Sequence, residues 1–308
     1  MPYIKSLNQY VPSKQVPFEE IEACSSVDAN QLRVMRRIYG LDRIAIAECS
    51  PMEMFDRALI RALDGLEGDL VAVLHVHTAP GVKPFEDSAL SKLPILDSYP
   101  NVVTFGSATN NCASLISALE VADAILSNAS PSSVVAICAC DVVFTECLRL
   151  IPGVTVCGDS AGVILIANTS PGHLLKSLAI ETYGQHAAGA WQEPHEFSEF
   201  SSTYTDRLCK VMSLALKRAG LEWSEVSLIF PHNVNLTSWR EAMSRLGLSV
   251  DKVFLSRVKE AGHCYGADTI INWIAAEEQN AISEGEHVML ATVGLGAVFA
   301  AAIFEIVS

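Results

Sequence analysis

Five short runs of almost continuous apolar residues constrain the fold of this chain most strongly. They are rich in Val, Leu and Ile, and longer stretches with apolar residues at helical spacing separate them. The first pattern is typical of strands buried on both faces, and the second is typical of amphipathic helices. A sheet that is buried on both faces must be covered by helices on both sides, so the sequence predicts an α/β fold with a parallel or mixed sheet. The predicted strands are residues 69–77, 134–140, 163–167, 226–230 and 288–293.

The predicted elements occur in the same order in the two halves of the chain. In each half a helix leads into a strand, a loop follows, and a second helix leads into a second strand. We interpret this order as a duplicated α/β unit, because two units that pack together bury more apolar surface than either alone. A Pro/Gly break at residues 169–173 predicts an N-terminal half (1–170) and a C-terminal half (171–308). The predicted helices are residues 56–68, 113–127, 206–225 and 267–283.

Composition narrows the class of protein. Of the 308 residues, 50% are hydrophobic and 18% are charged, which predicts a large buried core. A net charge of −14 argues against nucleic-acid binding, since proteins of that class are normally basic. No apolar run is long enough to cross a membrane, and the first residues show no signal peptide. The nine cysteines include no CxxC pair, so we expect free thiols in the cytoplasm and no zinc site.

Cys112 is the first candidate for chemistry. It follows a polar turn at residues 107–111 (SATNN) and opens a predicted helix whose apolar face carries Leu115, Leu119 and Leu126. A cysteine at a helix N-terminus lies among unpaired N–H groups at the positive end of the helix dipole, which favours the nucleophilic thiolate. The alternative is a small buried side chain, which is the usual environment of a cysteine.

Two histidines lie on predicted loops of the second half. His232 follows a buried strand and Pro231, at the end of the strand where catalytic and ligand-binding residues of α/β folds gather. His263 lies in the segment AGHCYG, where Gly262 and Gly266 allow the backbone to approach another group closely. For each histidine the alternative is an ordinary loop residue with a hydrogen-bonding role.

Other motifs are less specific. Residues 157–162 (CGDSAG) precede a predicted strand, and residues 294–296 (GLG) form a tight loop after the last one. His75 and His77 share one face of a strand, but without a third ligand at a fixed spacing we expect structural histidines and no metal. A group of arginines at helical spacing is either a phosphate site or a solvated surface. Its members are Arg33, Arg36 and Arg37.

In this order the motifs resemble those of the β-ketoacyl-acyl-carrier-protein synthase III family of thiolase-fold condensing enzymes. The shared order is a cysteine at a helix start, GD-x-AG before a strand, PH-x-x-NL, a glycine before a helix and a glycine-rich C-terminal loop. The resemblance covers nearly the whole chain and implies a duplicated thiolase-like fold of five αβαβα layers and a homodimer. The matching positions are Cys112 and residues 157–162, 231–236, 262–263 and 294–296.

The resemblance also implies a two-step reaction without a cofactor. Cys112 attacks an acyl thioester of coenzyme A or of an acyl carrier protein, His232 assists the thiolate, and backbone N–H groups of Cys112 and Leu295 form the oxyanion hole. The second substrate of the family is a malonyl thioester. It loses CO₂, and the resulting enolate, held by a His and an Asn side chain, attacks the acyl group. The candidates for binding the substrate or the carrier protein are Arg36, Arg37, Asn235 and Arg240.

This sequence departs from the family pattern at several positions. His263 stands where the family has Asn, so the triad becomes Cys112, His232 and His263. A similar triad serves the elongating ketosynthases, and a histidine can also act as a base toward a hydroxyl or an amine. Leu32 lies near the place of the family's tryptophan that stacks on coenzyme A, which favours a carrier-protein donor. Together with Leu295 in place of a family glycine, these changes indicate specialised metabolism more than housekeeping fatty-acid initiation.

Three alternatives stay open beside the favoured decarboxylative condensation. The first is acyl transfer to a hydroxyl or amine without decarboxylation. The second is a non-catalytic partner subunit of a ketosynthase heterodimer, although such subunits usually lack the nucleophile, which this chain retains as Cys112. The third is an unrelated cysteine hydrolase, which requires a carboxylate or amide that orients His232, and the spacing identifies none.

Overall fold

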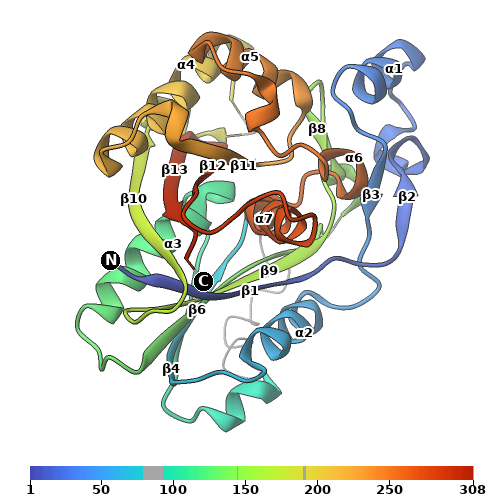
Figure 1. Ribbon diagram of the computed structural model, residues 1–308. Coiled ribbons are helices and arrows are strands. Elements are labelled where there is room, and N and C mark those ends of the chain that lie inside the picture. Colours follow the sequence, from blue (N-terminus) through green and yellow to red (C-terminus); the bar gives the residue numbers. More distant parts are fainter. Residues whose placement is uncertain (79–92, 144, 190–191, 308) are drawn as a thin grey trace.

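The computed structural model describes residues 1–78, 93–143, 145–189 and 192–307. Nine strands form one sheet in the order β11-β12-β13-β10-β1-β9-β6-β4-β5 (Figure 1). Three pairs, β4–β5, β4–β6 and β11–β12, are parallel and the other pairs are antiparallel, which confirms the predicted mixed sheet. The strands are β1 (Tyr3–Tyr10), β4 (Asp69–Val76), β5 (Val103–Ser107), β6 (Ser133–Asp141), β9 (Ser160–Ala167), β10 (His173–Thr182), β11 (Val226–Pro231), β12 (His287–Gly294) and β13 (Val298–Glu305).

Shorter strands and the helices complete the structure. β2 pairs with β3, and β7 pairs with β8, each as a two-stranded ribbon outside the large sheet. These strands are β2 (Gln15–Pro17), β3 (Arg43–Ala45), β7 (Leu150–Ile151) and β8 (Thr155–Val156). The helices are α1 (Ala29–Arg37), α2 (Pro51–Leu63), α3 (Ser114–Leu126), α4 (Pro194–Ala219), α5 (Leu236–Leu246), α6 (Val258–Ala261) and α7 (Asp268–Glu278).

Strands from the N-terminal part and strands from the C-terminal part of the chain occupy different sides of the sheet. The strands β4, β5, β6 and β9 all end by Ala167, whereas β10 to β13 begin at His173 or later. β1 joins the two groups, because it pairs with β9 over most of its length and with β10 at Tyr3 and Ile4. The division into halves at residue 170 stays a prediction.

Both faces of the central strands are buried, as the continuous apolar runs predicted. In β6, Val134, Ala136 and Cys138 pack in the hydrophobic cluster that contains α2. The alternate residues Val135 and Ile137 pack in the cluster that contains α3 and α7. The residues of β13 divide in the same way between the α3–α7 cluster and the cluster of α4 and α5. Because successive side chains of a strand point to opposite faces, a strand between two helical layers must be apolar throughout.

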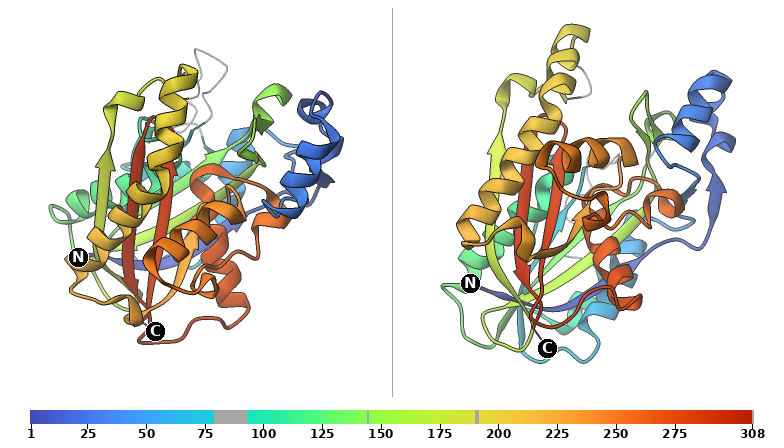
Figure 2. Two further views of the ribbon diagram at one scale, coloured as in Figure 1. Left: turned by 90° about the horizontal axis from the view of Figure 1, so that it is seen from above. Right: turned by 45° about the horizontal axis from the view of Figure 1, so that its top comes forward.

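The helices and strands therefore form five layers. α2 covers the outer face of the N-terminal strands, and α4 and α5 cover the outer face of the C-terminal strands (Figures 1 and 2). α3 and α7 lie between the two groups of strands, where Leu119, Ile270 and Trp273 are buried. The predicted thiolase-like arrangement of layers is confirmed. α1, β2 and β3 form a projection at one side of the molecule (Figure 1).

Two helices begin earlier than the sequence pattern predicted. Ser50 caps α2 by accepting a hydrogen bond from a backbone N–H of its first turn, so the helix starts at Pro51. Glu193 takes part in a capping box at the start of α4, which therefore begins at Pro194 and not near residue 206. As a result Tyr204 lies within a helix, and its position becomes important at the functional site.

All nine cysteines are free thiols. Seven of them are buried, whereas Cys49 is partly exposed and Cys147 is exposed. Across the parts of the chain that the structure describes, no helix combines the length and the apolar character that a membrane span requires.

A buried ion pair fixes the CGDSAG motif (residues 157–162). Two guanidinium nitrogens of Arg149 each lie 3.0 Å from an oxygen of Asp159, and the two side chains are only 4% and 0% exposed. Asp159 also accepts hydrogen bonds from the backbone N–H groups of Ala47 and Val143. A buried carboxylate is stable only when its charge and lone pairs are satisfied in this way. The motif is therefore held in one conformation.

Gly158 within this motif has no room for a side chain. A Cβ atom there would lie 2.1 Å from the backbone oxygen of Ala261. We expect Gly158→Ala to lower the free energy of unfolding by about 2 kcal/mol or more, because two backbone segments must move apart. The matched control is Gly184→Ala, since a Cβ at that position meets nothing within 4 Å. Urea unfolding followed by circular dichroism measures both variants, and equal midpoints would contradict the prediction.

Candidate active site

Cys112 lies in a tight turn directly before α3. The preceding Asn111 has a left-handed φ of 49°, a conformation that Asn tolerates better than most residues. A 3₁₀ turn, Asn111–Ala113, then leads into the helix, so the cysteine lies at a helix start as predicted. The Thr292 hydroxyl of β12 donates a hydrogen bond to the carbonyl oxygen of Cys112 over 3.3 Å. The cysteine is thus fixed between the central helix and a C-terminal strand, where it is 6% exposed.

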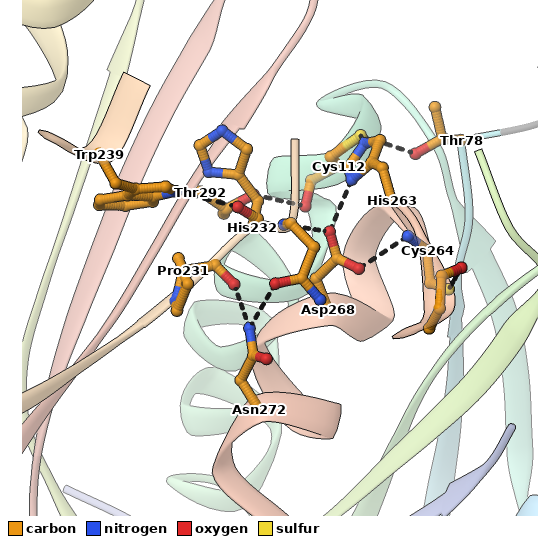
Figure 3. Close-up of polar contacts among 12 residues, drawn as sticks. Thr78, Cys112, Pro231, His232, Trp239, His263, Cys264, Asp268, Asn272 and Thr292 are labelled. Atoms are coloured by element: carbon orange, nitrogen blue, oxygen red, sulfur yellow. Dashed lines mark hydrogen bonds and ion pairs between the residues drawn. The ribbon is translucent and has the colours of Figure 1, made fainter. Parts of the chain in front are cut away.

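The imidazole of His263 lies against this thiol. Its Nε2 is 3.4 Å from the Sγ of Cys112 (Figure 3). The backbone of His263 donates to the carbonyl of Val156 over 2.9 Å and accepts from the N–H of Gly158 over 3.0 Å. The preceding Gly262 has a φ of 72°, and a Cβ there would lie 2.8 Å from the oxygen of Val156. The glycine therefore permits the close backbone approach that the sequence predicted, and the CGDSAG motif positions His263.

Asp268 is a residue of the site that no sequence motif identified. Its Oδ2 lies 2.6 Å from the Nδ1 of His263, on the side of the ring opposite the thiol (Figure 3). The carboxylate is fully buried, and it also accepts hydrogen bonds from the N–H groups of Asn233 (2.6 Å) and Cys264 (2.7 Å). Cys112, His263 and Asp268 therefore form one continuous hydrogen-bonded chain.

This chain sets the charge of His263. Burial opposes protonation of the ring, but the negative charges of Asp268 and of the Cys112 thiolate outweigh burial, and the pKa of His263 is raised well above its usual value. Hydrogen bonds with an ionised partner are stronger than neutral ones, and a low local dielectric increases the effect. The site therefore favours a protonated His263 next to the sulfur of Cys112.

His232 lies nearby but has a different partner. Its Nε2 is 2.7 Å from the hydroxyl of Tyr204 on α4, and the indole N–H of Trp239 donates to its carbonyl oxygen over 3.0 Å. The rings of His232 and His263 have centroids 6.4 Å apart. Burial and the positive charge of His263 lower the pKa of His232 to about 3. His232 is therefore neutral at pH 7. The two histidines that the sequence singled out lie together, and their protonation states differ: His263 is charged and His232 is neutral.

The loop between β12 and β13 packs on the turn that carries the cysteine. The side-chain amide of Asn111 donates a hydrogen bond to the carbonyl oxygen of Leu295. A Cβ at Gly294 would lie 1.9 Å from the carbonyl oxygen of Asn110, so only glycine fits this contact. The predicted oxyanion residues, Cys112 and Leu295, thus lie on adjacent segments, and their role stays a prediction.

The four residues predicted to bind the substrate or the carrier protein lie apart from one another and make different local contacts. Arg36 forms a two-pronged ion pair with Glu19, with both N–O distances 2.6 Å. Asn235 caps α5 by accepting a hydrogen bond from a backbone N–H. Arg37 and Arg240 are exposed. Arg36 and Arg240 each line a separate surface pocket of about 330 Å³. Their roles in binding stay predictions.

Known proteins resemble this chain along its whole length. The family model described as 3-oxoacyl-[acyl-carrier-protein (ACP)] synthase III C terminal matches residues 216–306. The β-ketoacyl-[acyl-carrier-protein] synthase III of Coxiella burnetii (strain Dugway 5J108-111) is 22% identical over 320 residues, which are 98% of each chain. The solved 3-oxoacyl-[acyl-carrier-protein] synthase III of Aquifex aeolicus VF5 superposes with a TM-score of 0.79 and 20% identity, covering 99% of this chain and 100% of its own. ChlB3, named an acyltransferase, superposes with a TM-score of 0.86 and 17% identity, covering 100% of this chain and 98% of its own.

The substitution Asp268→Asn tests the charge chain, because it removes the charge of the carboxylate and preserves its size. Without the carboxylate, burial of a charged His263 is unopposed, and the imidazolium no longer stabilises the thiolate. We therefore expect iodoacetamide at pH 7 to alkylate Cys112 in the variant at no more than about one tenth of the wild-type rate. Peptide mass spectrometry measures each thiol separately. The exposed Cys147 is the internal control and should react equally in both proteins, and an unchanged rate at Cys112 would refute the role of Asp268.

Proposed function

Because this chain belongs to the β-ketoacyl-acyl-carrier-protein synthase III family of thiolase-fold condensing enzymes, we propose that it transfers an acyl group from a thioester, through Cys112, to a hydroxyl or amine acceptor. The observation that carries this proposal is the chain of Cys112, His263 and Asp268. A nucleophile beside a base that a carboxylate orients can serve both steps of acyl transfer. The donor is a thioester of coenzyme A or of an acyl carrier protein, and the reaction needs no cofactor.

Acylation begins from the Cys112 thiolate and the protonated His263. The sulfur attacks the thioester carbonyl, and the carbonyl oxygen takes up negative charge. The proposed donors to this oxygen are the backbone N–H groups of Cys112 and Leu295, and each such donor contributes about 3 kcal/mol. As the tetrahedral state collapses, the bond to the leaving sulfur breaks and His263 gives it a proton. The products are an S-acyl cysteine, a free thiol and a neutral His263.

Deacylation uses the same groups in the opposite direction. The Nε2 of the neutral His263 accepts the proton of a hydroxyl or amine while the oxygen or nitrogen attacks the acyl carbon. Asp268 stabilises the imidazolium that forms. The tetrahedral state then expels the Cys112 thiolate and so restores the initial ion pair. An asparagine in place of His263 could not accept this proton, so the departure from the family pattern has a chemical use.

Decarboxylative condensation with a malonyl thioester is the second candidate. The closeness of His232 to His263 favours it, because the enolate that forms needs hydrogen-bond donors at its oxygen. We rank it below acyl transfer because the Nε2 of His232 is hydrogen-bonded to Tyr204. Both reactions fit fatty-acid-like or polyketide-type metabolism. The nine free thiols support a reducing compartment such as the cytoplasm.

Intact-mass spectrometry with a panel of acyl-coenzyme A thioesters tests the proposal. We expect one acyl adduct on the wild-type chain, none on Cys112→Ala, and an unchanged adduct on Cys147→Ser, which removes the exposed thiol. The isolated acyl-enzyme is then mixed either with alcohols and amines or with a malonyl thioester. Loss of the adduct to an alcohol or amine without release of CO₂ supports acyl transfer, whereas release of one CO₂ per adduct supports condensation. If no thioester labels Cys112, both candidates fail.

We further propose that two copies of the chain pair through β5. Among the described strands β5 ends the sheet, and its outward side chains include Val103, which is 59% exposed, and Phe105, which is 38% exposed. The unpaired backbone groups of an edge strand bind another edge readily, and exposed apolar side chains beside them add buried area. A pairing across a two-fold axis would extend the sheet from one protomer into the other.

Val103→Lys tests this pairing, because a charge within the contact must be buried unpaired in both copies. We expect light scattering after size exclusion to give a dimer for the wild-type chain and a monomer for the variant. Val121→Lys is the matched control, since Val121 is also exposed (40%) but lies on α3. A monomeric wild-type chain, or a variant that remains dimeric, would contradict the proposal.

A further inference from the structure

Tyr204 and His232 form a second buried pair beside the nucleophile, and the proposed reaction does not use it. Tyr204 belongs to α4, and His232 follows β11. The hydroxyl of Tyr204 lies 2.7 Å from the Nε2 of His232. The ring of His232 has its centroid 6.4 Å from that of His263, which contacts the Sγ of Cys112. The pair therefore lies beside the nucleophile and its histidine.

The surroundings hold both members of the pair in position. The ring of Tyr204 packs edge-on against Phe200 and Phe299, with centroids 5.7 Å away in each case. The backbone N–H of His232 donates to Ala291 over 3.1 Å, and its carbonyl accepts from Trp239. Neither side chain can leave the other without disturbing a packed layer.

The pair is neutral whichever way its hydrogen bond runs. Burial raises the pKa of Tyr204, and burial together with the charge of His263 lowers that of His232. If the phenol donates, the Nε2 of His232 carries no hydrogen. If Nε2 carries the hydrogen, that hydrogen already points at the phenol oxygen. A ring nitrogen makes one hydrogen bond in the plane of the ring, so in both cases Nε2 has none to offer to a substrate.

We propose that Tyr204 is a positioning residue that decides between the two reactions of this site, by occupying the Nε2 of His232 and so suppressing decarboxylation of malonyl thioesters. When a malonyl thioester loses CO₂, its C–C bond breaks and the electron pair moves to the thioester oxygen as an enolate. That oxygen needs preorganised donors. With Tyr204 present, neither histidine offers this oxygen a donor through Nε2, because the neutral His263 of the acyl-enzyme keeps its one N–H on Asp268. Without the hydroxyl, the Nε2 of His232 becomes available as a donor. This inference rests on the proposed acyl transfer and adds a determinant of specificity to it.

Tyr204→Phe removes the hydroxyl and keeps the ring between Phe200 and Phe299. The probe is malonyl-coenzyme A labelled in its free carboxyl group, and the measured quantity is CO₂ released per acylated Cys112. We expect this ratio to rise about 10-fold or more in the variant, since one donor to an oxyanion changes a rate by at least that factor. The double variant Tyr204→Phe/His232→Leu should lose the gain, because leucine has no hydrogen-bond donor. Thermal unfolding establishes that each variant is folded.

Tyr183→Phe is the matched control. Tyr183 also packs edge-on against Phe299, at 5.7 Å, but its hydroxyl bonds to Glu181. The CO₂ ratio of this variant should equal that of the wild-type chain. A folded Tyr204→Phe protein whose ratio is unchanged or lower would overturn the inference, since a lower ratio would make Tyr204 itself a donor to the enolate. Failure of the proposed function gives a different result, namely a wild-type chain that already releases one CO₂ per turnover or that never becomes acylated.

Discussion

The fully buried carboxylate of Asp268 is the group on which the arrangement of the site depends. A charge without solvent is tolerated only when hydrogen-bond donors surround it, and three donors converge here. They are the ring of His263 and the backbone N–H groups of Asn233 and Cys264. Asn233 directly follows His232, so one carboxylate fastens the loop after β11 to the loop before α7. Because leaving any of these donors unpaired would itself be costly, the two loops keep one relative position.

The layers of the fold bring these loops to the nucleophile. Strands that are apolar on both faces allow helices on both sides, and this leaves α3 and α7 in the middle layer with Cys112 and Asp268 at their starts. Glycines then permit backbone segments from distant parts of the sequence to meet. Gly294 lies against the carbonyl of Asn110, and Gly158 lies against that of Ala261. The site thus forms where backbone segments from distant parts of the sequence are in close contact.

Sequence reasoning identified the parts of the structure that are determined locally. β6 and β12 were predicted because nearly every residue in them is apolar. β1 and β10 contain polar residues in their interiors and become strands by pairing with partners far away in the sequence, so no local pattern indicated them. Asp268 was missed for a similar reason. A turn at Tyr265, with a left-handed φ of 54°, brings the carboxylate back to His263. In the sequence alone, an acidic residue in the first turn of a helix is explained by its favourable interaction with the helix dipole, so nothing indicated a second role. Tyr204 lay outside the predicted helix, so its contact with His232 could not be anticipated.

A single buried charge gives the two histidines of the site different protonation states. Asp268 makes protonation of His263 favourable, and the resulting positive charge makes protonation of His232 unfavourable. With ring centroids 6.4 Å apart in a buried environment, the two rings cannot both carry a proton readily. Environments that separate the pKa values of neighbouring groups define which one exchanges protons during catalysis and which one stays neutral. In the proposed reaction the carboxylate therefore suits His263 to the acid and base role, and His232 stays a neutral group hydrogen-bonded to Tyr204. An asparagine at position 263, as in the family pattern, would supply a hydrogen-bond donor but could not exchange a proton. A histidine at this position gains that ability, and its raised pKa depends on Asp268.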